Sequence, residues 1–125
     1  MRTALLVEDT PMASTPLEVA LAAIAGLRTI VVEDGRKAID YLEGEFGGEV
    51  CAVLTDLNMP LVDGFQLITH LRASNRFFTL PVLVLSASTE YGAARRSIEL
   101  GANAFFAKPY SPLEVRKKLE ELLGA

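Results

Sequence analysis

The sequence predicts an α/β fold in which five parallel strands form one doubly wound sheet with helices on both faces. The first observation behind this prediction is that short apolar runs alternate with amphipathic segments along the whole chain. Because parallel strands need crossover connections and helices supply them, the alternation predicts parallel pairing. The second observation is size. A chain of 125 residues, 50% hydrophobic and 22% charged, is enough for one domain with its own core and not for two.

Five short runs rich in Val, Leu, Ile or Phe are bounded by polar or turn residues, and we predict that they are the strands. Three of these runs are continuous enough to be buried on both faces of the sheet. In chain order the predicted strands are Ala4–Val7, Thr29–Val32, Val50–Leu54, Val82–Leu85 and Ala104–Phe106.

Apolar residues recur at helical spacing between and after these runs, which predicts five helices. The segment Tyr91–Leu100 has the weakest helical pattern, because Gly92 lowers helix stability and few apolar residues form its stripe. The other four stripes are Leu17, Ala20, Leu21 and Ile24; Ala38, Ile39 and Leu42; Phe65, Ile68 and Leu71; and Leu113, Leu119, Leu122 and Leu123.

Two helix starts carry local signals. Thr15-Pro16-Leu17-Glu18 has the form of a capping box with proline at the first helical position. Because proline is unfavourable inside a helix, we predict that the first helix begins near Thr15, after a long first loop. Asp63 precedes Gly64 where a turn enters the third helix, and we predict that it caps that helix.

Charge and cysteine content exclude several classes of protein. Twelve Lys and Arg against sixteen Asp and Glu leave a net charge of −4, which argues against nucleic-acid binding by these residues. The longest apolar run, Val19 to Leu27, has nine residues and is too short to span a bilayer, and the N-terminus lacks a signal-peptide pattern. A single cysteine, Cys51, cannot form an internal disulfide, which fits a cytoplasmic protein.

Polar residues follow four of the five predicted strands. Glu8 and Asp9 follow the first strand, Asp56 the third, Ser86 the fourth and Lys108 the fifth. In an open parallel sheet the functional crevice lies beyond the carboxyl ends of the strands. The sequence therefore predicts that three carboxylates, one hydroxyl and one ammonium group converge at one edge of the sheet.

These groups have the chemistry of a phosphoryl-transfer site. Clustered carboxylates repel one another unless they bind a proton or a cation, and Mg²⁺ prefers oxygen ligands. Lysine and serine can contact the anionic oxygens of a phosphoryl group. Asp56, which follows the central strand and is flanked by the others, is the expected carboxylate nucleophile.

With these motifs in order, the chain resembles the receiver domain of two-component response regulators. The stretch Asp56–Gly64, Asp-Leu-Asn-Met-Pro-Leu-Val-Asp-Gly, closely matches the phosphoacceptor loop of that family. The acidic pair precedes it, and Ser86-Ala87 and then Lys108-Pro109 follow it. The resemblance covers the whole chain, so it implies one receiver domain over residues 1–125 with a flavodoxin-like strand order of 2-1-3-4-5.

The resemblance also implies a role for each residue at the predicted edge. Asp56 would accept a phosphoryl group from a phosphohistidine. Asp9, Asp56 and the main-chain carbonyl of Asn58 would bind Mg²⁺, with Glu8 acting through water. Lys108 would pair with the phosphoryl group, and its bond to Pro109 would be cis.

Two further residues are implied in a conformational switch. Ser86 would move to the phosphoryl oxygen and Phe105 would turn inward, changing the surface of helix 4, strand 5 and helix 5. The implied partners are a histidine kinase or histidine phosphotransfer protein and a downstream protein effector, with no nucleic acid and no membrane, and a homodimer through that surface stays open. Phe105 stands where tyrosine is commoner in the family, so the hydrogen bond of a tyrosine phenol would be missing from the switch. Glu8 stands where aspartate is commoner.

The family resemblance implies a protein that catalyses only its own phosphorylation and dephosphorylation, and three other functions are weighed against it. A phosphatase of the haloacid dehalogenase type also uses an aspartate nucleophile, but it needs a second acid where Asn58 stands. A flavodoxin-like cofactor binder would have a phosphate-binding loop after the first strand, where this chain has hydroxyls but no glycine. A receiver that has lost phosphorylation would not be expected to keep all the site residues. The 125 residues are taken up by the fold, so we expect either a stand-alone receiver or a longer regulator divided after the last helix.

Overall fold

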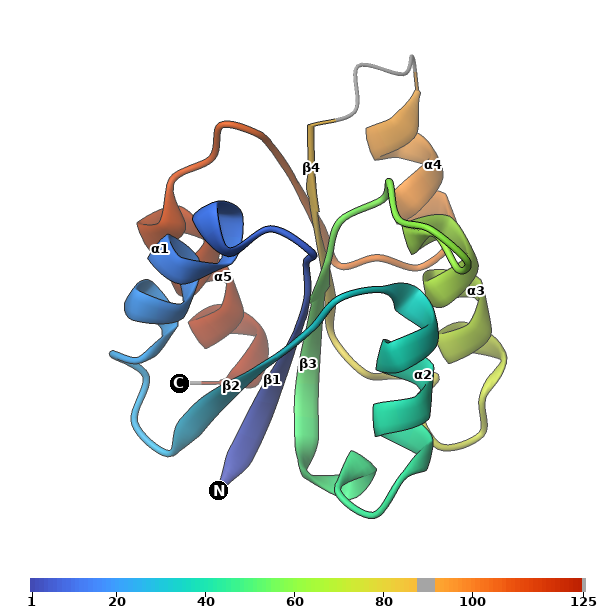
Figure 1. Ribbon diagram of the computed structural model, residues 1–125, viewed down its shortest axis with the longest axis horizontal. Helices are drawn as coiled ribbons and strands as arrows, with labels where there is room; N and C mark the ends of the chain where they lie inside the picture. The colour runs from blue at the N-terminus through green and yellow to red at the C-terminus, as the bar shows by residue number, and fades with distance from the viewer. Residues whose placement is uncertain (88–91, 125) are drawn as a thin grey trace.

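A computed structural model of the chain describes residues 1–87 and 92–124. All strand pairs are parallel, and the five strands form one sheet in the order β2-β1-β3-β4-β5 (Figure 1). The predicted fold class and strand order are therefore confirmed. In chain order the elements are β1 Arg2–Val7, α1 Pro11–Leu21, β2 Leu27–Val32, α2 Gly35–Glu43, the 3₁₀ turn η1 Gly47–Glu49, β3 Val50–Thr55, α3 Gly64–Ala73, β4 Val82–Ser86, α4 Ala93–Glu99, β5 Ala104–Ala107 and α5 Pro112–Leu123.

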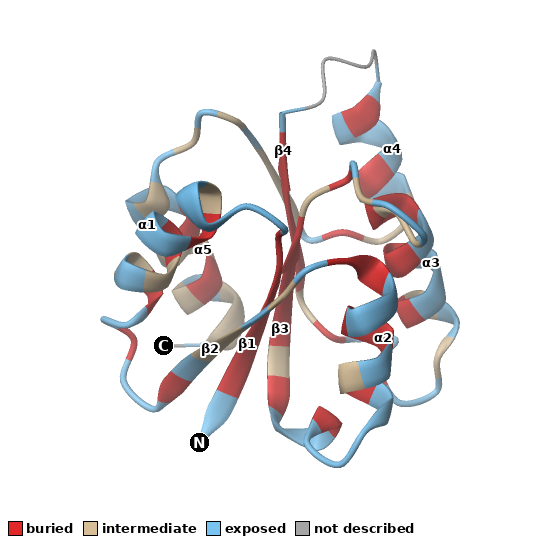
Figure 2. Ribbon diagram, in the orientation of Figure 1, coloured by how far each residue is buried: buried red, intermediate tan, exposed pale blue. Residues whose placement is uncertain are grey.

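Each of the five predicted strands is present, and each extends one or two residues beyond its apolar run. The three strands inside the sheet, β1, β3 and β4, are almost wholly buried, as the continuous apolar runs predict (Figure 2). The fourth helix is shorter than its predicted segment and covers Ala93–Glu99, where only the small residues Ala93 and Ser97 are buried. Tyr91, where that segment was predicted to begin, lies outside the described residues.

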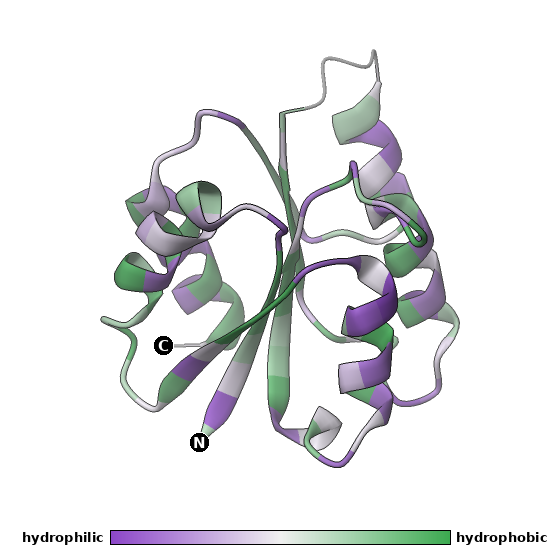
Figure 3. Ribbon diagram, in the orientation of Figure 1, coloured by the Kyte–Doolittle hydropathy of each residue, from purple (hydrophilic) through white to green (hydrophobic). Residues whose placement is uncertain are grey.

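The sheet separates two hydrophobic clusters. One face packs against α2, α3 and α4, where Ile39, Leu42, Leu67 and Ile68 are among the buried residues. The other face packs against α1 and α5 through residues such as Leu17 and Val115. Figure 1 shows the two groups of helices on opposite sides of the sheet, and Figure 3 shows hydrophobic residues concentrated along the central strands. Burial on both faces accounts for the alternation of apolar runs and amphipathic segments. No helix in the described ranges is long and apolar enough to cross a membrane.

The predicted start of the first helix is wrong. Helix α1 begins at Pro11 and continues through Pro16, so no long loop precedes Thr15. Pro11 stands at the first helical position, where its missing N–H is no loss, and Ala13 and Ser14 already donate backbone hydrogen bonds to the Thr10 carbonyl. Pro16 has no N–H to offer the Met12 carbonyl four residues earlier. Burial of Ser14, Leu17 and Leu21 against the sheet offsets that lost bond.

Candidate functional site

Backbone hydrogen bonds between strands place Glu8 and Asp56 at the same edge of the sheet. The Glu8 N–H donates to the Val32 carbonyl at 2.9 Å, and the Asp56 N–H donates to the Val7 carbonyl at 3.3 Å. Glu8 and Asp56 therefore follow the neighbouring strands β1 and β3 at the same level. The strand pairing, rather than any contact between the two carboxylates, brings them together.

Lys108 reaches both carboxylates from β5. Its N–H donates to the Ser86 carbonyl at 2.8 Å, which aligns it with the end of β4, and its peptide bond to Pro109 is cis as the family resemblance implies. Its Nζ donates to Glu8 Oε2 and to Asp56 Oδ2, each at 3.0 Å. The three side chains are 21%, 7% and 15% exposed, so solvent screens these ion pairs only in part.

The environment of Lys108 keeps its ammonium group charged. Burial lowers the pKa of Lys108, but hydrogen bonds from the ammonium to Asp56 and Glu8 and the charges of both carboxylates outweigh burial, so the pKa lies above its ordinary value. The nearby Tyr110 is half-buried, and burial raises the pKa of its phenol. Lys108 is therefore a fixed positive charge beside Asp56 at neutral pH.

The main chain holds the other oxygen of the Asp56 carboxylate. The N–H groups of Leu57 and Asn58 donate to Asp56 Oδ1 at 2.6 and 3.2 Å, while Oδ2 contacts Lys108. The Thr55 hydroxyl donates to the Asp56 carbonyl at 2.8 Å. The side chain and main chain of Asp56 are thus both fixed, which suits a nucleophile that must meet its substrate in one orientation.

The start of α3 supports the loop that carries Asp56. Asp63 caps the helix, as predicted, and its side chain accepts from the Gln66 N–H at 2.8 Å while the Gln66 side chain accepts from the Asp63 N–H at 2.9 Å. A Cβ on Gly64 would collide with the Asp56 carbonyl, and it would lie 2.7 Å from the Leu57 Cα. Glycine at this position therefore lets the start of the helix pack directly against the loop that carries Asp56.

Asp9 belongs to the site by position but not to the ion-paired cluster. It is exposed, and its carboxylate accepts from the Thr10 hydroxyl at 3.1 Å. Asn58 is also exposed at the edge of the same loop. The structure therefore brings Glu8, Asp56 and Lys108 into direct contact and leaves Asp9 and Asn58 open to solvent beside them.

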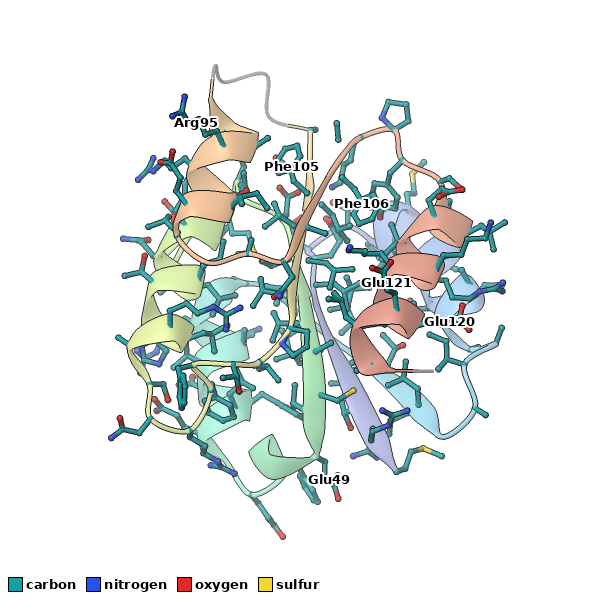
Figure 4. All side chains as sticks on the ribbon, turned by 180° about the vertical axis from the view of Figure 1, so that it is seen from behind. Glu49, Arg95, Phe105, Phe106, Glu120 and Glu121 are labelled. Carbon is teal, nitrogen blue, oxygen red and sulfur yellow. The ribbon has the colours of Figure 1, made fainter. Side chains whose placement is uncertain are left out.

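Ser86 and Phe105 lie behind the charged groups. Ser86 is the last residue of β4 and is only 1% exposed. Phe105 is partly buried and packs against the cluster that contains α4, whereas its neighbour Phe106 packs against the opposite cluster. Figure 4 shows the two aromatic side chains on opposite sides of β5. Phe105 thus lies on the face of the sheet that α2, α3 and α4 cover.

The donor set fits a divalent cation. The three carboxylates and one ammonium formally leave two negative charges, and oxygen atoms from Asp9, Asp56 and the Asn58 main chain are the hard ligands that Mg²⁺ prefers. Within the described ranges, no three His, Cys, Asp or Glu side chains are grouped to hold a metal alone. A bound Mg²⁺ would therefore also use main-chain oxygen and water, which is its usual coordination in proteins.

Sequence reasoning did not single out one contact of this site. The Thr10 N–H donates to Glu8 Oε1 at 3.3 Å and its hydroxyl donates to Asp9, so one residue touches both acids. The only signal for it in the sequence is a hydroxyl residue directly after the acidic pair. Such a signal is weak, because serine and threonine are common at helix starts for other reasons.

Comparison with known proteins identifies relatives of the whole domain. A family model described as the response regulator receiver domain matches residues 4–120. The response regulator Rre1 of Synechocystis is 31% identical over 96% of this chain and 51% of its own length. The chemotaxis protein CheY1 of Helicobacter pylori is 30% identical over 96% of this chain and 95% of its own. The chain thus spans about half of one curated relative and nearly all of another.

Solved structures agree with these matches. A response regulator from Chloroflexus aurantiacus has a TM-score of 0.87 and 28% identity, over 99% of this chain and 98% of its own. The receiver domain of the histidine kinase PA1611 from Pseudomonas aeruginosa, with magnesium in its active-site cleft, has a TM-score of 0.83 and 29% identity over 99% and 98%. The phosphorylated cyanobacterial regulator RcpA has a TM-score of 0.82 and 28% identity over 96% and 91%.

Proposed function

The chain belongs to the response regulator receiver domain family, and from this membership we propose that it is a signalling domain controlled by phosphorylation of Asp56. The observation that carries the proposal is that one ammonium, Lys108 Nζ, lies 3.0 Å from both Asp56 and Glu8. This arrangement holds a reactive carboxylate and a phosphoryl-binding cation together before any substrate arrives. The solved structure of phosphorylated RcpA supports the same use of the fold.

The transfer step follows from how Asp56 is held. Two main-chain N–H groups hold Oδ1, whereas Oδ2 lies beside the Lys108 ammonium that would receive the phosphoryl oxygens, so Oδ2 attacks the phosphorus of a phosphohistidine. An O–P bond forms, the P–N bond breaks, and the electron pair remains on the imidazole, which takes up a proton. Lys108 then pairs with the phosphoryl oxygens instead of with the free carboxylate, and its raised pKa keeps it charged for that purpose.

The metal requirement is part of the same proposal. Mg²⁺, when bound, would offset the negative charge of the carboxylates and of the transferred phosphoryl group. Asp9, Asp56 and the Asn58 carbonyl would hold it, and Glu8 would act through water. The magnesium-containing receiver domain of PA1611 supports this choice of ion.

The proposed output is a change in the surface formed by α4, β5 and α5. Ser86 would move to a phosphoryl oxygen and Phe105 would turn inward. Two observations support α4 as the responsive element. Only Ala93 and Ser97 of this helix are buried, and Phe105 packs against the hydrophobic cluster to which Ala93 belongs. Beryllofluoride, a phosphoryl mimic, should then shift NMR signals across this surface in the wild type, and Ser86→Ala should reduce those shifts.

The proposed partners rest on family membership. The phosphodonor is a histidine kinase or histidine phosphotransfer protein, and the changed surface binds a downstream protein, with a homodimer through that surface as a further outcome. We place this exchange in the cytoplasm, without nucleic acid or membrane bound to this domain, and assign residues 1–125 to one receiver domain. The chain acts on no separate substrate and catalyses only its own phosphorylation and dephosphorylation.

Mass spectrometry after incubation with Mg²⁺ and acetyl phosphate tests the proposal. The wild type should gain the mass of one phosphoryl group, Asp56→Asn should gain none, and Asp40→Asn should behave as the wild type. Asp40 is the matched control because it is an exposed acid on α2 whose ion pair is with Arg36. If the wild type gains no mass and binds no beryllofluoride, the proposal is wrong. Sustained phosphate release from varied substrates would instead favour the phosphatase.

A further inference from the structure

Asp9 is the carboxylate of the site that Lys108 does not hold. Glu8 and Asp56 each pair with the Lys108 ammonium, whereas Asp9 makes no ion pair with any residue that the structure describes. Its carboxylate is exposed, and the contact that orients it is the 3.1 Å hydrogen bond from the Thr10 hydroxyl to Oδ1. The bond leaves Oδ2 of Asp9 available to another ligand. The direction in which Asp9 points therefore depends on Thr10.

Thr10 occupies the N-cap position of α1, but its side chain makes no capping hydrogen bond. It precedes α1 with extended backbone dihedrals, but its side chain accepts no hydrogen bond from the first turn of the helix. A threonine at this position ordinarily accepts from an N–H two or three residues later. Here the hydroxyl donates back to Asp9, and the Thr10 N–H donates to Glu8 Oε1 at 3.3 Å. The residue is thus directed toward the acidic pair rather than toward its own helix.

We propose that Thr10 is a positioning residue whose hydroxyl holds the Asp9 carboxylate in one orientation and so raises the affinity of the site for Mg²⁺. This inference rests on the proposed function, in which Asp9 is a metal ligand. A flexible exposed carboxylate must lose rotational freedom when it binds a cation, and a hydrogen bond made beforehand reduces that loss. Pro11, which follows directly, restricts the backbone of Thr10 to the extended conformation that it adopts and so helps keep the hydroxyl in place.

Titration with MgCl₂ in a calorimeter, without phosphodonor, tests this inference. Thr10→Val keeps the branched shape and removes the hydroxyl, whereas Thr10→Ser keeps the hydroxyl. We expect Thr10→Val to raise the Mg²⁺ dissociation constant about tenfold, the low end for residues that orient a metal ligand, because the bond is exposed. Thr10→Ser should stay within about twofold of the wild type, because it restores the ligand-orienting bond. The metal-free unfolding temperature should change little in either variant, since the hydroxyl makes no cap bond.

The outcomes separate this inference from the proposed function. Asp9→Asn in the same titration sets the level expected when the ligand itself is lost. If the wild type binds Mg²⁺ and Thr10→Val binds it equally or more tightly, the positioning role of Thr10 is wrong while the metal site stands. Failure of Thr10→Ser to restore wild-type binding overturns the inference as well. A wild type that does not bind Mg²⁺ overturns both.

Discussion

Lys108 Nζ lies 3.0 Å from Asp56 Oδ2, although the two residues are 52 positions apart and β4 lies between their strands. The lysine bridges that gap because its main-chain N–H is bonded to the Ser86 carbonyl at the end of β4, which places its side chain over the edge of the sheet. A second carboxylate, Glu8, shares the same ammonium at 3.0 Å. One cation thus neutralises part of the repulsion between two carboxylates that the strands place side by side.

The first prediction concerns that shared cation. Lys108→Met keeps an unbranched side chain, one heavy atom shorter, and leaves Glu8 and Asp56 without a counter-charge. Because both carboxylates are mostly buried, we expect the free energy of unfolding at pH 7 without Mg²⁺ to fall by about 1–3 kcal/mol. Urea denaturation measures the change. Lys117→Met, at an exposed position on α5, is the matched control and should stay within about 0.5 kcal/mol of the wild type.

Magnesium should restore part of the stability that Lys108→Met loses. A bound divalent cation supplies positive charge beside Asp56, so saturating MgCl₂ should stabilise Lys108→Met at least as much as the wild type. The comparison uses the same urea curves with and without the metal. Equal stability of wild type and Lys108→Met in the absence of Mg²⁺ would show that the two ion pairs do not stabilise the fold.

Most of the fold was predictable because its signals are local. The continuous apolar runs at β3 and β4 indicate strands that are buried on both faces. Polar residues such as Asp56 and Lys108 follow the carboxyl ends of strands, where the functional edge of a parallel sheet lies. The grouping of Glu8, Asp56 and Lys108 therefore follows from topology alone. The bond between Thr10 and Asp9 did not follow, since a hydroxyl beside a helix start has several competing partners.

The start of α1 was not predictable from local rules. Thr15-Pro16 has the form of a helix start, yet Pro11 provides a start four residues before Thr15, and tertiary packing carries the helix past Pro16. Local helix propensity predicts a helix boundary poorly where buried residues such as Leu17 and Leu21 hold the segment against the sheet. The sequence contained both signals without indicating which one packing would favour.

The second prediction follows from that competition within α1. Pro16→Ala restores an N–H that can donate to the Met12 carbonyl and removes the ring from the helix interior, so the free energy of unfolding should rise by about 1–2 kcal/mol. Pro11→Ala, at the first helical position, should change it by less than about 0.5 kcal/mol. Denaturant unfolding of both variants makes the comparison. An equal effect of the two substitutions would mean that Pro16 does not disturb the helix.

The third prediction concerns the junction between α3 and the loop before β5. The Arg72 guanidinium donates to the Gly101 carbonyl at 2.8 and 3.0 Å and to carbonyls of Phe77 and Phe78. A Cβ on Gly101, whose φ is +116°, would lie 2.8 Å from Arg72 Cγ and Nε. Gly101→Ala should therefore combine backbone strain with displacement of Arg72 and lower the free energy of unfolding by about 2–4 kcal/mol.

Gly26→Ala is the matched control for Gly101→Ala. Gly26 also has a positive φ, +74°, but a Cβ there would meet no atom within 4 Å. It should therefore show the backbone strain alone, about 1–2 kcal/mol. The loss in the double variant Arg72→Met/Gly101→Ala should be smaller than the sum of the two single losses, because both substitutions disturb the same hydrogen bonds to the Gly101 carbonyl. If Gly26→Ala and Gly101→Ala destabilise the protein equally, the contact with Arg72 contributes nothing.

The last prediction is a loss of stability at alkaline pH that begins with Cys51. Burial raises the pKa of the Cys51 thiol, with opposing effects of Arg2 and a backbone hydrogen bond that are smaller. The unfolded chain, whose thiol has a pKa of about 8.5, therefore loses this proton first as the pH rises. Because the folded state then binds more protons than the unfolded state, the free energy of unfolding must fall with increasing pH.

Cys51→Ala separates this contribution from the groups that titrate later. Between about pH 8.5 and 9.5 the wild type should lose stability under reducing conditions, while Cys51→Ala should not. Above about pH 10 both proteins should lose stability. Folding raises the pKa of Tyr110 and of Lys108, as it does that of Cys51, and in the unfolded chain these two groups lose their protons at about pH 10. Urea denaturation at each pH gives the two curves. Parallel curves from pH 8 upward would show that Cys51 is not the group responsible, because only its substitution distinguishes the two proteins.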